Sequence, residues 1–129
     1  MRTDQTGKLI TWTVTAGQAG ERSQVQALLD QGQIGRRRRP KRIAADKGYT
    51  GRPVRQLLRR RKIGAVIPRF STERKQGVRF DRPAYRARNV VERSINRLKQ
   101  YRGIATRYDK LARIFNAGLT LVVIVQFWL

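Results

Sequence analysis

Asp46 and Glu92 are the two residues of this sequence best placed to do chemistry, and both are carboxylates. The chain has 129 residues, with 30 lysines and arginines against 8 aspartates and glutamates, and it has no cysteine or histidine. This composition excludes disulfides, zinc sites built from thiolates or imidazoles, and catalysis by a cysteine or histidine side chain. A metal bound by this chain is therefore expected to be a hard cation held by carboxylates, Mg²⁺ or Mn²⁺.

Asp46 follows the short apolar run RIAA and opens the sequence DKGY, residues 46–49. An aspartate before Lys-Gly can simply shape a turn. It also ends a predicted buried strand, and open α/β sheets bind ligands beyond the carboxyl ends of their strands. The residues alone leave both interpretations open.

Glu92 is the single acid in RNVVERSINRLKQYRG, residues 88–103. If residues 84–102 form one helix, four polar side chains share an arc of about 60° over four turns: Tyr85, Arg88, Glu92 and Lys99. Glu92 could instead only pair with Arg88, at a gain of a few tenths of a kcal/mol. If Asp46 and Glu92 shared a metal, they could support phosphoryl transfer.

The other two sides of this predicted helix have different characters. An apolar stripe predicts the buried side, formed by Ala84, Ala87, Val91, Ile95 and Leu98. The basic side faces solvent or a polyanion and contains Arg86, Arg93 and Arg97.

The formal net charge of +22 indicates a polyanionic partner, and nucleic acid is the first to consider. The basic loop at residues 33–42 includes GRRRRPKR and is either a solvated loop or a phosphate-contacting one. No signal peptide is visible, and the apolar run Leu121–Val125 is too short for a membrane span. We therefore expect a cytoplasmic, nucleoid-associated protein without a membrane partner.

The elements that must position these residues alternate between strands and helices. Strands are predicted in KLITWTVTAG, with Ile10, Trp12 and Val14 on one face, and in RIAAD and IGAVIP. Helices are predicted in GERSQVQALLDQG, in GRPVRQLLRRRK and over residues 84–102, before an apolar terminal segment. The order β-α-β-α-β-α-α predicts an α/β fold in which helices cover a sheet with parallel strands.

DKGY together with YRARNVVERSINRLK, residues 85–99, resembles bacterial insertion-sequence transposases of the DDE superfamily. The insertion-sequence-4- and -5-like groups carry a signature of Tyr, two residues, Arg, three residues, Glu, six residues and Lys. Tyr85, Arg88, Glu92 and Lys99 reproduce every gap. The similarity extends over nearly the whole chain from about Gly7 onward.

The resemblance implies a ribonuclease H-like fold, a mixed sheet flanked by helices, that is incomplete here because the first strand is missing. It implies that Asp46 and Glu92 are the second and third catalytic carboxylates and ligands of Mg²⁺ or Mn²⁺. Lys99 would contact DNA near the active site, and Tyr85 and Arg88 would support strand binding or helix placement. The basic side of the helix would add Arg93 and Arg97 to the DNA contacts.

The first catalytic aspartate of the family has no counterpart in this sequence. Asp4, the only acid before the strand LITWTVTA, lies in RTDQTG, which we expect to be a polar turn rather than an apolar strand. Residues 1–129 are thus expected to form the C-terminal part of a catalytic domain. Such a fragment would be inactive alone and would need an upstream-frame transposase fragment as its partner. We expect it to act on transposon ends and target DNA, and to do so as a homo-oligomer.

Two alternatives come from other functional classes. A non-catalytic DNA-binding relic or regulator of transposition would account for the charge and the missing aspartate. The second alternative is a basic RNA-binding protein of ribosomal type. It would require the combination of Asp46 with Tyr85, Arg88, Glu92 and Lys99 to be accidental. No exposed aromatic cluster for base stacking stands out in the sequence either.

Overall fold

The computed structural model of the chain describes residues 1–15, 19–31, 39–73, 79–106 and 111–129. The chain divides into two compact units. We call Met1–Gln18 together with Asn89–Leu129 the terminal unit, and Ala19–Arg88 the central unit. Each has its own buried core.

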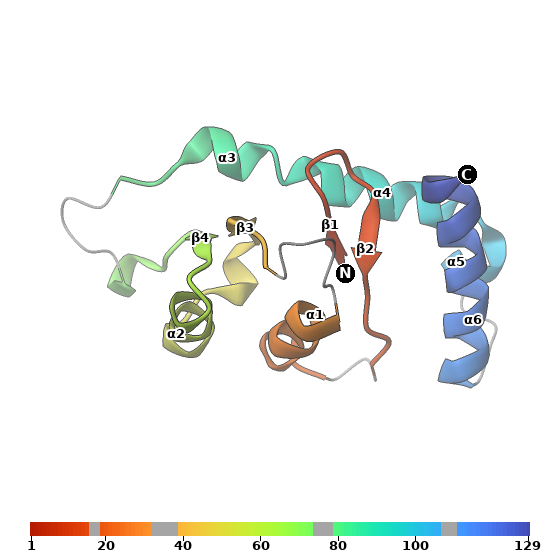
Figure 1. Cartoon of the computed structure of the whole chain (residues 1–129), viewed down its shortest axis with the longest axis horizontal. Coiled ribbons are helices and arrows are strands. Elements are labelled where there is room, and N and C mark those ends of the chain that lie inside the picture. The colour runs from red at the N-terminus through yellow and green to blue at the C-terminus, as the bar shows by residue number, and fades with distance from the viewer. Residues whose placement is uncertain (16–18, 32–38, 74–78, 107–110) are drawn as a thin grey trace. The chain divides into compact units, whose positions relative to one another are not determined.

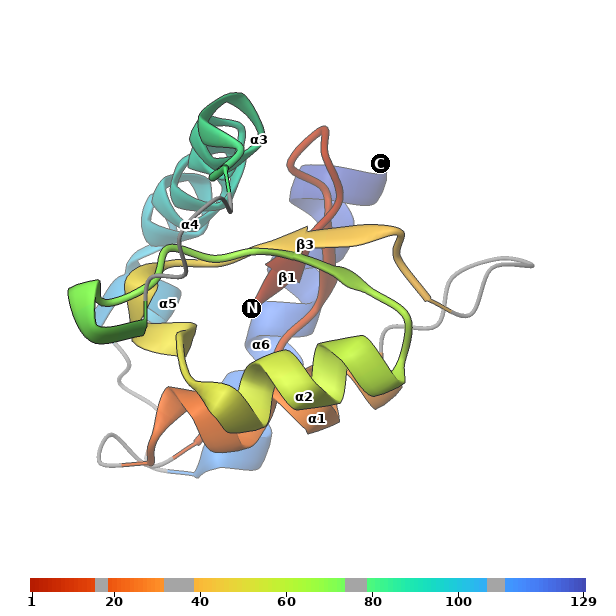
Figure 2. The same ribbon diagram turned by 90° about the vertical axis from the view of Figure 1, so that its left-hand side faces the viewer.

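The central unit is built on a parallel pair of strands, β3 (Arg42–Ala44) and β4 (Gly64–Val66). Two helices, α1 (Val25–Gln31) and α2 (Arg52–Arg60), lie on the same side of this pair (Figure 2). The predicted strand–helix–strand order over residues 42–66 and the parallel pairing are confirmed. The unit also contains α3 (Arg82–Arg86) and short 3₁₀ turns at Glu21–Gln24, Lys47–Tyr49 and Ser71–Glu73.

The start and the buried face of α2 follow from its sequence. Pro53 lies in the first turn, where its missing N–H has no helical partner to lose. Val54 and Leu58 are one turn apart, and both are buried. They join the core of the central unit with Leu29, Ile63 and Ile67.

The terminal unit combines a hairpin with helices from the end of the chain (Figure 1). Strands β1 (Arg2–Thr3) and β2 (Leu9–Thr11) pair antiparallel. The helices are α4 (Asn89–Lys99), α5 (Arg102–Thr106) and α6 (Ala112–Val123), and α6 ends in a π-helical turn at Ile124–Trp128. The core of the unit contains Leu9, Leu98, Leu119, Val123 and Phe127.

The hairpin differs from its prediction in two ways. RTDQTG was predicted to be a polar turn outside any strand, but Arg2 and Thr3 form β1 and only the residues between β1 and β2 turn. Along β2, Leu9 and Thr11 are buried and Ile10 is only half-buried, so the more buried face is opposite to the predicted one. Leu9 determines which face of β2 is buried, because it packs with Leu98 and Leu119.

The predicted single helix over residues 84–102 is wrong. Three helices occupy the region, α3 (Arg82–Arg86), α4 and α5. The Ala87 N–H still makes a helical bond to the Pro83 carbonyl, but the Arg88 N–H bonds to the Tyr85 carbonyl, only three residues back, so α3 ends in a tighter turn. On α4 the expected buried position Leu98 is confirmed, and Ser94 is buried as well. Ala87, expected on the buried side, follows α3 and is exposed.

The α/β class is confirmed. The described strands form two separate two-stranded sheets, one in each unit, where the sequence predicts one mixed sheet. Residues 33–38 of the predicted basic loop lie outside the described residues, and Arg42, its last residue, opens β3. No helix in the described part of the chain combines the length and apolar character needed to cross a bilayer.

Candidate functional site

Asp46 lies directly beyond the parallel strand pair, as predicted. The strand pairing extends one residue past β3, since the Ala45 N–H donates to the Val66 carbonyl at 3.3 Å. Asp46 is half-buried and caps the 3₁₀ turn Lys47–Tyr49, accepting from the Gly48 N–H at Oδ1 over 2.9 Å. The turn-shaping interpretation is therefore correct. The cap engages Oδ1 of Asp46, and Oδ2 accepts no hydrogen bond from the described residues.

Two cationic side chains hold the turn that follows Asp46. Arg22 Nε donates to the Gly48 carbonyl over 2.9 Å, and Lys47 Nζ lies 4.8 Å from the centre of the Phe70 ring. Arg22 and Lys47 are exposed, so both remain available to solvent or to a phosphate. Sequence reasoning missed Arg22 because its contact is with a residue 26 positions away.

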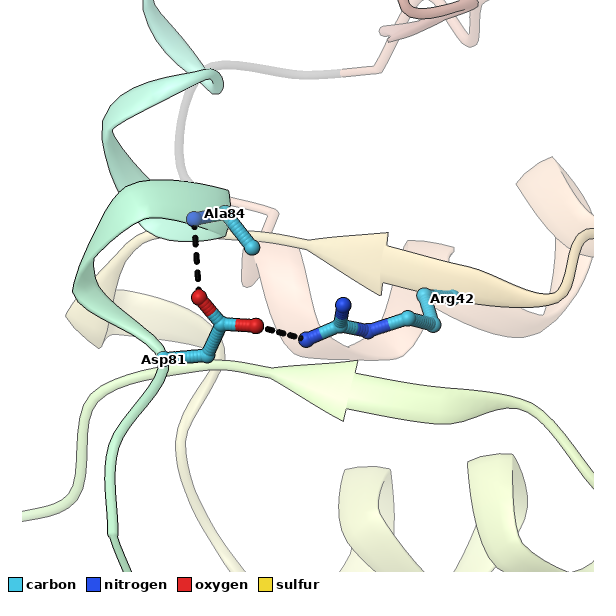
Figure 3. A network of polar contacts seen from close by, with 3 residues as sticks. All are labelled: Arg42, Asp81 and Ala84. Carbon is cyan, nitrogen blue, oxygen red and sulfur yellow. Dashed lines mark hydrogen bonds and ion pairs between the residues drawn. The ribbon is translucent and has the colours of Figure 1, made fainter.

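An ion pair ties α3 to the strand that leads to Asp46. Asp81 caps α3 by accepting from the Ala84 N–H at 3.0 Å, and its other oxygen accepts from Arg42 Nη2 at 2.6 Å (Figure 3). The hydrogen bond from Arg42, aided by that from the Ala84 amide, holds the pKa of Asp81 below its usual value. Arg42 belongs to β3, so this pair fixes the start of α3 against the parallel strands.

Tyr85 and Arg88 lie together at the end of the central unit. The Arg88 guanidinium lies over the Tyr85 ring, 5.4 Å from its centre, and the Phe80 ring is a second neighbour of Tyr85, with the two ring centres 5.4 Å apart. Both motif residues are half-buried. The structure therefore brings them into contact through a turn and a cation–π interaction, not through one continuous helix face.

Glu92 lies in the first turn of α4 and is half-buried, with its Oε2 atom buried. A carboxylate at this end of a helix is stabilised by the exposed amide dipoles. Lys99 is seven residues further along the same helix, so it lies on the same side as Glu92, about 20° away and roughly 10 Å along the axis. The predicted shared face thus holds for this pair.

The position of α4 depends on a contact that the sequence did not suggest. Ser94 Oγ is buried and lies 2.6 Å from the Gly7 carbonyl and 2.8 Å from the Val90 carbonyl. Gly7, in the turn of the hairpin, has φ +90°, and a Cβ there would lie 3.1 Å from Ser94 Oγ. The hairpin therefore approaches α4 closely at Val90 and Ser94, which lie two residues before and two residues after Glu92.

Exposed cations surround the rest of α4. Arg93, Arg97 and Lys99 are all exposed, as predicted for residues that face a polyanion. Arg97 and Lys99 lie in the last turn, where positive charge is favourable to the helix dipole. Their solvent exposure leaves their charges available to phosphate groups.

Asp4 is engaged by its own turn. Its Oδ1 accepts from the Thr6 N–H at 2.8 Å, the Thr6 hydroxyl at 2.7 Å and the Lys8 N–H at 2.9 Å. Slight burial raises the pKa of Asp4, but these hydrogen bonds outweigh it and leave the pKa below its usual value. The side chain thus organises the hairpin turn.

The chemistry of the donors fits a hard metal, because carboxylate oxygens are ligands that Mg²⁺ and Mn²⁺ prefer. Asp46 belongs to the central unit and Glu92 to the terminal unit. Within residues 1–15, 19–31, 39–73, 79–106 and 111–129, no three acidic side chains gather into a group that could hold a metal ion. Of the seven predicted site residues, the structure shows contact for Tyr85 with Arg88 and a shared helix face for Glu92 with Lys99.

Comparison with known proteins identifies the class. The family model described as the transposase DDE domain matches residues 1–127. The chain therefore belongs to the transposase DDE domain family. No curated protein and no solved structure matches it.

Proposed function

We propose that the chain is the C-terminal part of the catalytic domain of an insertion-sequence-4/5-like DDE transposase, with a ribonuclease H-like arrangement in the complete domain. Its function is DNA strand cleavage and transfer in transposition. The observation that carries the proposal is the place of Asp46 directly beyond β3, in a chain that belongs to the transposase DDE domain family. Carboxyl ends of parallel strands are where α/β folds bind ligands.

In this proposal Asp46 and Glu92 hold Mg²⁺ or Mn²⁺. When bound, the metal supplies activation of the attacking oxygen and stabilisation of the leaving oxygen. The chain itself orients the two ligands. The Gly48 amide holds one oxygen of Asp46, and Arg22 secures the carbonyl of the same glycine. Glu92 lies in the first turn of α4, which holds the carboxylate on a helix.

The cations of α4 seat the DNA backbone beside this centre. Lys99 lies on the Glu92 side of the helix and contacts DNA nearest to the reacting phosphate. Arg93 and Arg97 are exposed and contact phosphates further along the strand. Arg88, held over the Tyr85 ring, supports strand binding at the junction before α4.

In this proposal a third carboxylate comes from polypeptide outside these 129 residues. Asp4 is the acid nearest the first strands, and its Oδ1 already accepts three hydrogen bonds within its own turn. We therefore propose that the chain alone does not cleave DNA and that a segment carrying an aspartate, such as an upstream-frame fragment, completes the site.

A non-catalytic DNA-binding relic or regulator of transposition is the second candidate. It is favoured by the net charge of +22 and by the absence of a group of three acids among the described residues. Such a protein would bind transposon DNA and compete with an active transposase without cutting.

The two candidates are separated by complementing the chain. The test extends the chain at its N-terminus with an aspartate-bearing strand and measures Mn²⁺-dependent nicking of supercoiled DNA. We expect the unextended chain to be inactive and the extended chain to nick DNA. An otherwise identical extension with asparagine, and Glu92→Gln in the active extension, should both return nicking to background.

Two outcomes would contradict the proposal. An extended chain that folds, binds DNA and still does not nick it would favour the relic. If the unextended chain nicks DNA and Asp4→Asn leaves that activity intact, the inference of a missing carboxylate is wrong.

A further inference from the structure

Arg55 connects the two segments that leave the parallel strand pair at its carboxyl end. It lies near the start of α2, and its Nη2 atom donates to the Thr50 hydroxyl oxygen over 3.1 Å. The same atom lies 2.9 Å from the Ile67 carbonyl oxygen and 3.2 Å from that of Pro68. Thr50 belongs to the segment after β3, whereas Ile67 and Pro68 directly follow β4. One guanidinium group therefore holds both segments together.

Thr50 is the far end of the turn that Asp46 begins. The Tyr49 N–H donates to the Asp46 carbonyl over 3.2 Å, and the Thr50 N–H donates to the Lys47 carbonyl over 3.1 Å. Thr50 is also fully buried, with 0 % of its surface exposed. Residues 46–50 thus form one hydrogen-bonded turn, which β3 fixes at one end and Arg55 fixes at the other.

A second contact joins the same two segments at the surface. Lys47, in the turn, lies over the Phe70 ring, with 4.8 Å between Nζ and the ring centre. Phe70 follows β4 by four residues, so it extends the segment that Arg55 holds at Ile67 and Pro68. The part-buried contacts of Arg55 and the exposed contact of Lys47 therefore act on the same pair of segments.

The position of Arg55 is unfavourable for a positive charge unless its contacts compensate. Arg55 is half-buried, so its guanidinium group loses part of its hydration. It also lies near the N-terminal end of α2, where the helix dipole disfavours a cation. Hydrogen bonds to three oxygen atoms offset both costs. A lysine would keep the charge but lacks the planar set of donors that reaches these oxygens.

We propose that Arg55 is a positioning residue of the candidate metal site. It fixes the turn of residues 46–50 against the segment after β4, and this turn sets the direction in which the Asp46 carboxylate faces the metal. The role rests on the proposed function, because it requires Asp46 to be a metal ligand. Arg55 acts through Thr50 and the turn, not by direct contact with metal or DNA.

The first measurement is amide hydrogen exchange in the full chain, followed by NMR. Arg55→Lys keeps the positive charge and should release the far end of the turn. The Gly48 and Tyr49 amides, which both donate to Asp46, should then exchange at least about tenfold faster than in the wild type, because the turn opens more often. Thr50→Val, which removes the acceptor hydroxyl, should act in the same direction, whereas Thr50→Ser keeps the hydroxyl and should resemble the wild type. This pair of variants tests the contact even if Arg55→Lys does not fold.

The second measurement is the Mn²⁺ concentration that reduces the Lys47 and Gly48 amide signals to half their intensity. Arg55→Lys and Thr50→Val should raise this concentration by about tenfold, the order of effect expected when a residue that orients a metal ligand is lost. Thr50→Ser should leave it near the wild-type value. A role confined to stability would not change it, because the measurement is made on the folded chain.

Two control variants separate positioning from general stability. Arg39→Lys makes the same substitution at an arginine whose Nη1 donates to the Arg61 carbonyl over 2.8 Å, directly after α2. Ile63→Ala weakens the core of the central unit but lies just before β4, at the opposite end of the strand pair from Asp46. Neither should change the Mn²⁺ concentration for half-broadening.

Three results would overturn the positioning role. Unchanged exchange of the Gly48 and Tyr49 amides in Arg55→Lys and Thr50→Val would show that Arg55 does not hold the turn. Faster exchange with an unchanged Mn²⁺ response would show that the turn does not orient the metal ligand. An equal loss of Mn²⁺ response in Ile63→Ala would assign the effect to stability. A wild-type chain whose Lys47 and Gly48 signals do not respond to Mn²⁺ would instead contradict the proposed metal site itself, and the role of Arg55 would fail with it.

Discussion

The Ser94 hydroxyl lies 2.6 Å from the carbonyl oxygen of Gly7, joining residues 87 positions apart in the sequence. It also lies 2.8 Å from the Val90 carbonyl, one turn earlier in α4. A hydroxyl has one proton to donate, so Ser94 serves the two carbonyls in turn. This contact holds the β1–β2 hairpin against the helix that carries Glu92.

Replacing Ser94 should loosen that contact. Ser94→Ala leaves the buried Gly7 carbonyl without its donor and should lower the free energy of unfolding by about 1–2 kcal/mol. Gly7→Ala should also destabilise, because φ is +90° and the new Cβ would lie 3.1 Å from Ser94 Oγ. Urea unfolding of both single variants and the double variant measures this. The double variant should lose less than the sum, and strict additivity would show that the two residues are not coupled.

The Ser94 contact also shows what the sequence could not reveal. Ser94 lies on the wheel beside the predicted apolar stripe, but a serine gives no sign of burial, and its partner is in the first turn of the chain. The end of α3 at Arg86 was missed for a related reason. No glycine or proline stands at Ala87 or Arg88, and the helix ends where the Arg88 N–H bonds to the Tyr85 carbonyl three residues back.

The elements that were predicted correctly are those with a clear local sequence pattern. Pro53 and the spacing of Val54 and Leu58 located α2, and the apolar runs around Ile43 and Ala65 located the parallel strands. Asp46 was placed correctly beyond its strand for the same reason. The catalytic roles of Asp46 and Glu92 remain predictions, because a carboxylate's role depends on groups that local sequence does not identify.

Asp81 should give the stability of the central unit a dependence on acid pH. Its pKa is lowered in the folded chain, chiefly by Arg42, so its contribution is present above the ordinary aspartate pKa near 3.8 and is lost as pH falls through the lower folded value. Asp81→Asn keeps an acceptor for the Ala84 amide but loses the charge. The wild type should therefore be more stable than this variant above about pH 5, and the difference should shrink as pH falls below the ordinary aspartate pKa.

Arg42→Gln provides the control for this ion pair. It should reproduce the pH-dependent loss, and adding it to Asp81→Asn should cost little more. Chemical unfolding at pH 2, 4 and 7 measures all four proteins. A gap between wild type and Asp81→Asn that is equally large at all three pH values would mean that charge at Asp81 is not the cause.

DNA affinity should fall steeply with salt, because each neutralised phosphate releases counterions. Changing Arg93, Arg97 and Lys99 together to glutamine should reduce the slope of log affinity against log salt by about 0.9 for each phosphate that the variant no longer neutralises. Arg113→Gln, an exposed arginine on α6, is the single-charge control and should change the slope less than Arg97→Gln does. Fluorescence anisotropy with a labelled duplex measures the slopes. An unchanged slope in the triple variant would remove α4 from the DNA interface.

The most direct test of the central claim, that Asp46 and Glu92 bind the same metal, is paramagnetic broadening by Mn²⁺ in an amide NMR spectrum of the full chain. We expect low concentrations of Mn²⁺ to broaden two sets of amides first, those of Lys47 and Gly48 beside Asp46 and those of Val91 and Arg93 beside Glu92. Asp46→Asn and Glu92→Gln should each protect both sets, whereas Asp30→Asn, which removes a carboxylate paired with Arg61, should protect neither. Broadening that follows each carboxylate independently, or that spreads equally to Asp30 and Asp81, would contradict a shared metal site.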